Sequence, residues 1–72
     1  MKTIDDIERI INSGGGIIVD SSMTTDALVK IASLAVEKKC TLIVKNAGEK
    51  TTDHLVMIAS QGTGAVILDL TD

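Results

Sequence analysis

The sequence predicts an α/β domain in which three αβ units, in the order αβαβαβ, build one three-stranded parallel sheet. Three observations support this prediction: a nine-residue segment recurs along the chain, each copy begins with threonine, and each copy is followed by a short aliphatic run. A chain of 72 residues allows one small domain, here 1–72. The units are expected over about 3–20, 24–45 and 51–70.

The repeat is the strongest of these signals. Segments 24–32 (TTDALVKIA) and 51–59 (TTDHLVMIA) are identical at seven of nine positions, and their starts lie 27 residues apart. Segment 3–11 (TIDDIERII) fits the same frame more loosely. A repeated segment indicates a repeated structural unit, so we expect three units of similar structure that stack on one another.

Each copy of the repeat has the features of a helix start. The threonines Thr3, Thr24 and Thr51 can each accept a hydrogen bond from an amide of the first helical turn. An aspartate follows two residues later, where the positive end of the helix dipole stabilises negative charge. Aliphatic residues then recur with a period near 3.6. Glycines in segments 14–16 and 62–64 suit the left-handed conformation that ends many helices.

A short aliphatic run follows each helix: 17–20 (IIVD), 42–45 (LIVK) and 66–69 (VILD). Runs without polar alternation are typical of parallel strands. Two strand orders remain open. Order 1-2-3 gives a short solenoid-like repeat with both crossover helices on one face of the sheet, and order 2-1-3 gives a small doubly wound sheet. Order 1-2-3 is favoured because it gives the repeated units similar environments.

Order 1-2-3 leaves one face of the sheet bare. Successive side chains of a strand point to opposite faces, so Ile18, Ile43 and Ile67 share one face and six aliphatic residues share the other. A bare aliphatic face is unfavourable for a monomer, which predicts a homo-oligomer or a protein partner covering it. We take the larger set as the possible interface and expect a charged substitution at Val44 to dissociate the oligomer. That set is Ile17, Val19, Leu42, Val44, Val66 and Leu68.

A possible ligand site lies where the strands end, because ligands of parallel α/β sheets bind beyond the carboxyl ends of the strands. Asp20, Lys45 and Asp69 occupy equivalent positions, so stacking in chain order sets an acid, a base and an acid side by side, with Ser21 next to them. These groups could bind a polar ligand or transfer a proton. A cross-strand ion pair that fixes the register is the favoured interpretation.

Other chemistry is not indicated, and we expect no catalytic residues, no metal site and no cofactor. His54 lies at a variable position of the repeat, and Cys40 is expected to be a small buried hydrophobe. Ten acidic and seven basic residues give a net charge of −3, and no aromatic residue could stack on a base, so nucleic acid is excluded as a partner. Even the longest apolar runs, such as 55–59 and 65–68, are far too short to cross a membrane.

Together these observations predict a non-enzymatic protein-interaction or self-association module with an unknown partner. The acidic start of the sequence is unlike a secretory signal, so the cytoplasm is the expected compartment. The alternative is a small-molecule-binding or catalytic domain with a polar site at the carboxyl ends of the strands.

Overall fold

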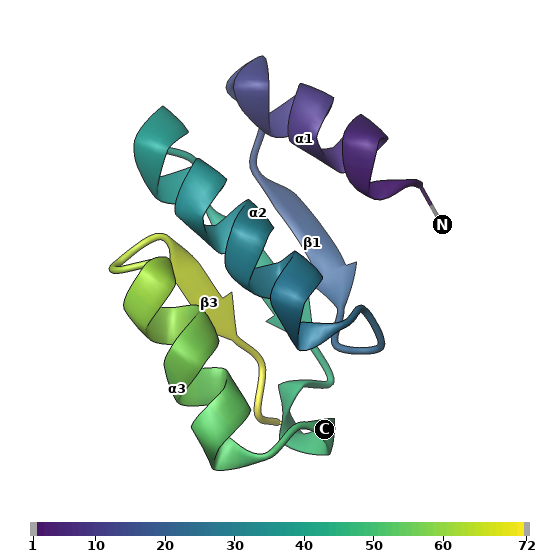
Figure 1. Cartoon of the computed structure of the whole chain (residues 1–72), viewed down its shortest axis with the longest axis vertical. Helices are drawn as coiled ribbons and strands as arrows, with labels where there is room; N and C mark the ends of the chain where they lie inside the picture. Colours follow the sequence, from purple (N-terminus) through teal and green to yellow (C-terminus); the bar gives the residue numbers. More distant parts are fainter. Residues whose placement is uncertain (1, 72) are drawn as a thin grey trace.

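The computed structural model describes residues 2–71 and contains three αβ units in chain order (Figure 1). The predicted αβαβαβ arrangement is confirmed, and a short 3-10 helix, η1, is added after the second strand. The elements are α1 (Ile4–Asn12), β1 (Ile17–Asp20), α2 (Thr25–Lys38), β2 (Leu42–Lys45), η1 (Ala47–Glu49), α3 (Thr52–Gln61) and β3 (Val66–Leu68).

The three threonines of the repeat are the N-caps of the three helices. Thr3, Thr24 and Thr51 have extended backbones, and each Oγ1 accepts a hydrogen bond from the amide three residues later, at 3.2, 3.2 and 3.3 Å. These bonds satisfy amides that have no carbonyl partner within the helix. At its other end, α2 stops at Lys39, whose left-handed backbone (φ 59°) turns the chain toward β2.

The strands form one parallel sheet in the order β1-β2-β3, which confirms the solenoid-like order and excludes the doubly wound alternative. Ile18, Ile43 and Ile67 lie side by side across the three strands. The helices lie next to one another over the same face of the sheet (Figure 1). Among the described elements, the strongest contacts therefore join units that are neighbours in the chain, as in other solenoids.

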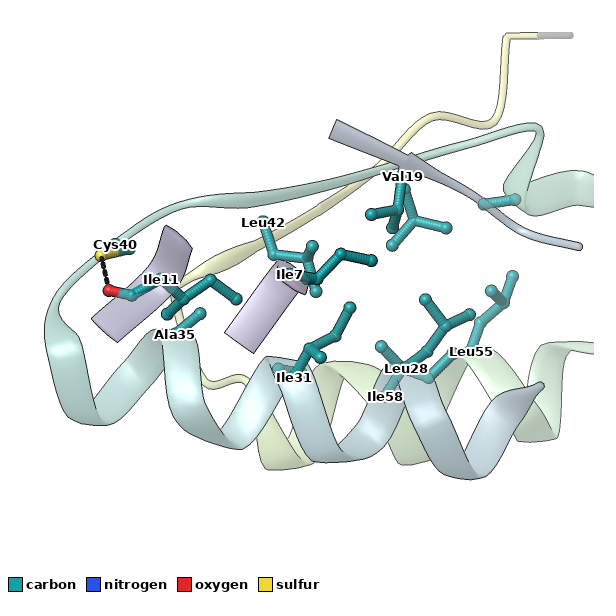
Figure 2. Close-up of a cluster of buried hydrophobic side chains, with 13 residues drawn as sticks. Ile7, Ile11, Val19, Leu28, Ile31, Ala35, Cys40, Leu42, Leu55 and Ile58 are labelled. Atoms are coloured by element: carbon teal, nitrogen blue, oxygen red, sulfur yellow. Dashed lines mark hydrogen bonds between the residues drawn. The ribbon is translucent and has the colours of Figure 1, made fainter. Parts of the chain in front are cut away.

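The hydrophobic core fills the space between this helix layer and the sheet (Figure 2). It is wholly aliphatic apart from Cys40, which is buried as expected and whose thiol donates to the carbonyl oxygen of Ile11 at 3.6 Å. The buried cluster consists of Ile7, Ile11, Val19, Leu28, Ile31, Ala32, Ala35, Cys40, Leu42, Val44, Ala47, Leu55 and Ile58.

The six residues that the sequence analysis took as a possible interface lie on the helix-covered face of the sheet, so that assignment is wrong. Leu42 and Val44 are fully buried beneath the helices, and the other four residues of the predicted set also belong to the core or pack against it. A partner lying on the face of the sheet cannot reach them, because the chain's own helices cover that side. The open face of the sheet carries Ile18, Ile43 and Ile67 instead. The residues wrongly assigned to the interface are Ile17, Val19, Leu42, Val44, Val66 and Leu68.

Candidate functional site

The fold brings the predicted polar residues to one end of the sheet. Asp20 and Lys45 are paired across β1 and β2, and each is the last residue of its strand. Asp69 follows β3 directly, and its amide donates to the carbonyl of Val44 at 2.9 Å. The acid, base and acid therefore lie in neighbouring units at the carboxyl ends of the strands, as the repeat register implies.

Asp20 is held by the turns around it. Its Oδ1 accepts from the Asn46 side-chain amide at 2.7 Å, and its Oδ2 accepts from the Ser22 backbone amide at 2.8 Å. The bond from Asn46, then those from Ser22, and to a smaller extent the charge of Lys45, lower the pKa of the Asp20 carboxyl. A carboxylate stabilised in this way is a poor proton acceptor near neutral pH.

Ser21 is buried and bonded rather than poised as a nucleophile. Its hydroxyl donates to the backbone carbonyl of Asn46 at 2.6 Å, and its amide donates to the carbonyl of Lys45 at 2.9 Å. A catalytic serine needs a base that accepts its proton, whereas this hydroxyl already donates to a carbonyl oxygen. Ser21 therefore ties the turn after β1 to the turn after β2.

Asn46 is the residue that the sequence analysis missed. It has a left-handed backbone (φ 57°), and it contacts both Asp20 and Ser21. The available signal was its residue type at a strand end, because asparagine adopts this conformation more readily than most non-glycine residues. The hydrogen bond from the Asn46 side chain to Asp20 thus joins the first two units here, together with the two hydrogen bonds that Ser21 donates.

Lys45 and Asp69 are less constrained. The Asp69 carboxylate accepts from the hydroxyl and the amide of Thr71, and these bonds, followed by a small contribution from the Lys45 charge, lower its pKa. Lys45 is exposed. Within residues 2–71, no ion pair joins Lys45 to Asp20 or Asp69. The expected cross-strand ion pair does not form among these residues, and the Lys45 charge acts on the two carboxylates only at longer range.

An open depression of about 530 Å³ lies beside this cluster, with Glu49 and Lys50 on its other side. The Lys50 ammonium donates to the Thr25 hydroxyl at 3.1 Å, and that hydroxyl also lies 3.4 Å from Nδ1 of His54. In the part of the chain that the structure describes, no three His, Cys, Asp or Glu residues are placed to hold a metal ion. The polar groups here chiefly bond to one another.

Acid is expected to weaken this cluster. Because folding lowers the pKa of Asp20, its contribution to stability is present above the unfolded-state pKa of about 4 and is lost as pH falls through the lower folded-state value. Asp20→Asn should therefore show a smaller decrease in Tm than the parent between pH 6 and pH 3, measured by circular dichroism. Asn46→Gly, which removes the main donor and keeps the backbone conformation, should flatten the profile similarly. Parallel profiles for all three proteins would contradict this prediction.

The second candidate site is the open face of the sheet, defined by Ile18, Ile43 and Ile67. Ile18 is 62% exposed and Ile67 is 53% exposed, while Ile43 on the central strand is half-buried. Asp20 and Lys45 border this row toward the carboxyl ends of the strands. An apolar centre with a charged border is the usual composition of a protein interface.

Comparisons with known proteins identify no relative: no family model matches the chain, and no curated protein or solved structure matches it. Among the described helices, none combines the length and the apolar character needed to cross a bilayer. Any functional assignment therefore rests on this chain's own residues.

Proposed function

We propose that this protein is a non-enzymatic interaction module that binds a protein surface through the open face of its sheet. The observation that carries the proposal is the exposure of Ile18 and Ile67 in one row with Ile43. Soluble monomers rarely leave such a row of large aliphatic side chains in water unless the surface has a binding role. A second copy of the chain and a different protein are both suitable partners for this face.

The open face has only three isoleucines, which limits the binding free energy that it can contribute. Burying a fully exposed isoleucine stabilises a complex by about 1.5–3 kcal/mol, so these partly exposed side chains together contribute roughly 2–4 kcal/mol. Association costs an estimated 4–15 kcal/mol in lost freedom and ordering. The three isoleucines alone therefore support weak binding, and a tighter complex needs contacts beyond them, such as the exposed Leu70 after β3.

Small-molecule binding at the strand ends is the weaker proposal. Asp20 and Ser21 already bond to Asn46, so a ligand would have to replace contacts that the protein makes with itself. The depression beside them is open rather than enclosed by apolar walls, whereas most small-molecule sites are concave and largely apolar.

Ile43→Lys tests the interaction proposal, because it places a charge at the centre of the open face and leaves the helix-covered side intact. We expect the parent protein to associate as its concentration rises from micromolar to millimolar, and Ile43→Lys to show a lower average mass in sedimentation velocity. Met57→Lys is the matched control, since Met57 is an exposed residue of α3 on the opposite side of the molecule. Equal masses for Ile43→Lys and the parent would contradict self-association through this face.

A further inference from the structure

We infer that the two ends of the stack bind each other, so that α3 and β3 of one molecule dock against α1 and β1 of a second copy. This inference goes beyond the proposed function, because it uses the ends of the stack rather than the open face. The sheet would then continue from β3 of one molecule into β1 of the next. The argument begins with the interface that holds α3 on α2 within one chain.

One ridge of α2 forms that internal interface. The Thr25 hydroxyl lies 3.4 Å from Nδ1 of His54, and the Ser33 hydroxyl donates to Oε1 of Gln61 at 3.3 Å. Val29 lies one helical turn from both Thr25 and Ser33, and it is partly buried against the core. The ridge therefore consists of two polar contacts with an aliphatic contact between them.

Small residues let the two helices approach closely beside this ridge. Ala32 of α2 is completely buried, and Gly62 at the end of α3 lies so near that an added Cβ would be 3.0 Å from the Ala32 methyl. Any helix that docks on this surface in the same way must place a small residue at this point.

The outer side of α3 repeats the same surface. Thr52, Val56, Ala59 and Ser60 stand 27 residues after Thr25, Val29, Ala32 and Ser33, and each pair has the same residue type. Val56 is 59% exposed and Ala59 is also exposed, whereas their counterparts on α2 are covered by α3. Within residues 2–71, no strand pairs with the outer edge of β3. This end is therefore a docking surface for one more αβ unit.

The side of α1 and β1 that has no preceding unit in a single chain matches this docking surface. In α2 and α3, the residues that face the preceding unit and the core include Ile31 and Ile58, which are fully buried. Ile10 of α1 occupies the equivalent position, yet it is 41% exposed. In sequence, Gly14 stands where α3 has Gly62, although Gly14 follows the C-cap of α1 with a left-handed backbone (φ 96°) and Gly62 is itself the C-cap of α3 (φ −100°). The end of α1 therefore also offers small residues for close approach, Ser13 and Gly14.

Hollows on this side of α1 leave room for a neighbour. An apolar groove of about 220 Å³ lies between α1 and β1, and its lining includes Ile7, Ile10 and Ile17. In the other two units, the residues equivalent to Ile7 and Ile10 are all buried: Leu28, Ile31, Leu55 and Ile58. Val66 and Leu68 of β3, which are only partly covered in a single chain, are suited to fill this groove in the next copy.

The polar residues of the two surfaces can also form hydrogen bonds with each other. Asp6 and Ser13 of α1 occupy the positions of His54 and Gln61 in α3, so they would face Thr52 and Ser60 of the other copy. Hydroxyl groups can donate to a carboxylate and to another hydroxyl. The four residues on the outer side of α3 carry no charge, so the helix contact brings no like charges together. Continuing the strand register does set Asp69 of one copy beside Asp20 of the next, and the contact between the sheets must accommodate these two carboxylates. This pairing of two different surfaces is head-to-tail, which gives rings or filaments rather than a closed two-fold dimer.

A disulfide cross-link between two single variants tests the arrangement. Continuing the register places Ile67 of one copy beside Ile18 of the next, and neighbouring parallel strands lie about 4.8 Å apart, within disulfide range. In a Cys40→Ala background, we expect a mixture of Ile18→Cys and Ile67→Cys to form a disulfide-linked dimer under mild oxidation. Each variant alone should form much less. Equal cross-linking in the separate samples, or none in the mixture, would overturn the inference.

Val56→Arg and Met57→Arg provide a second, matched test by sedimentation. Met57 corresponds to Lys30 of α2, which stays exposed although α3 is docked, so Met57→Arg should leave the average mass unchanged. Val56→Arg should reduce it to that of the monomer or of a face-to-face dimer. Equal masses for Val56→Arg and the parent would overturn the inference. If Ile43→Lys keeps the assembly and Val56→Arg abolishes it, the end-to-end contact stands and the open-face contact fails.

Discussion

Replacing Val44 with aspartate is expected to unfold the domain. Val44 is completely buried on the central strand, between Val19 and Leu68 of the neighbouring strands. An ionised carboxylate there would lose several kcal/mol of solvation without a partner, and the lost burial of valine costs about 1.5–3 kcal/mol more. A domain of 72 residues has a total stability of only about 4–11 kcal/mol. Far-UV circular dichroism should therefore show loss of the cooperative thermal transition.

Ile43→Asp is the control for this prediction, because Ile43 is the preceding residue on the same strand but points to the open face. It should remain folded, with a modest decrease in Tm. The contrast between adjacent positions reports which face of the sheet the helices cover. If Val44→Asp were folded with the Tm of Ile43→Asp, the arrangement of the two faces described here would be wrong.

The sequence carries most of the fold because local signals and the repeat agree. Thr3, Thr24 and Thr51 could be assigned as N-caps from residue type and spacing, and all three make the expected hydrogen bond. Strand order was the harder step, because both orders satisfy the aliphatic runs and the handedness rule. Similarity between the units decided it correctly, since equivalent sequences need equivalent neighbours.

The covered face of the sheet was also encoded in the sequence but was misinterpreted. Each four-residue run places its second and fourth residues on the same face. The fourth residues are Asp20, Lys45 and Asp69, so the face that includes Ile18 also carries charges, which a core does not accept. The face with two aliphatic residues per strand had to be the core. Residue counts per face were therefore more informative than the presence of large side chains on either face.

The details of the strand-end cluster could not be derived in the same way. The repeat predicted that Asp20, Lys45 and Asp69 share one end of the sheet, and they do. It could not predict that Asn46 bonds to Asp20, because that contact depends on a left-handed turn that the other two units do not share. The repeat describes what the units have in common, whereas this contact arises where they differ.

Gly62→Ala is expected to destabilise the protein through crowding rather than through backbone strain. Gly62 has a φ of −100°, which alanine adopts readily, but an added Cβ would overlap the Val66 Cγ2 methyl and approach that of Ala32. Ala32 is fixed to the backbone of α2, and valine has little freedom at χ1, so relief requires α3 to move away from α2. Overpacking of this kind costs about 1–3 kcal/mol, which corresponds to a decrease in Tm of roughly 5–20 °C.

Thermal unfolding of Gly62→Ala, Val66→Ala and the double variant isolates the cause of that loss. If the clash with Val66 is responsible, the double variant should be more stable than the sum of the two single effects, because the shorter side chain makes room for the new methyl group. Strict additivity would show that the methyl group meets its obstacle elsewhere, at Ala32 or at the carbonyl of Ile58, which would lie 3.3 Å away. An unchanged Tm for Gly62→Ala would contradict the close approach of α3 to α2. The end-to-end contact inferred above depends on a similar close approach, because it places Ala59 of one copy against the end of α1, near Gly14, of the next.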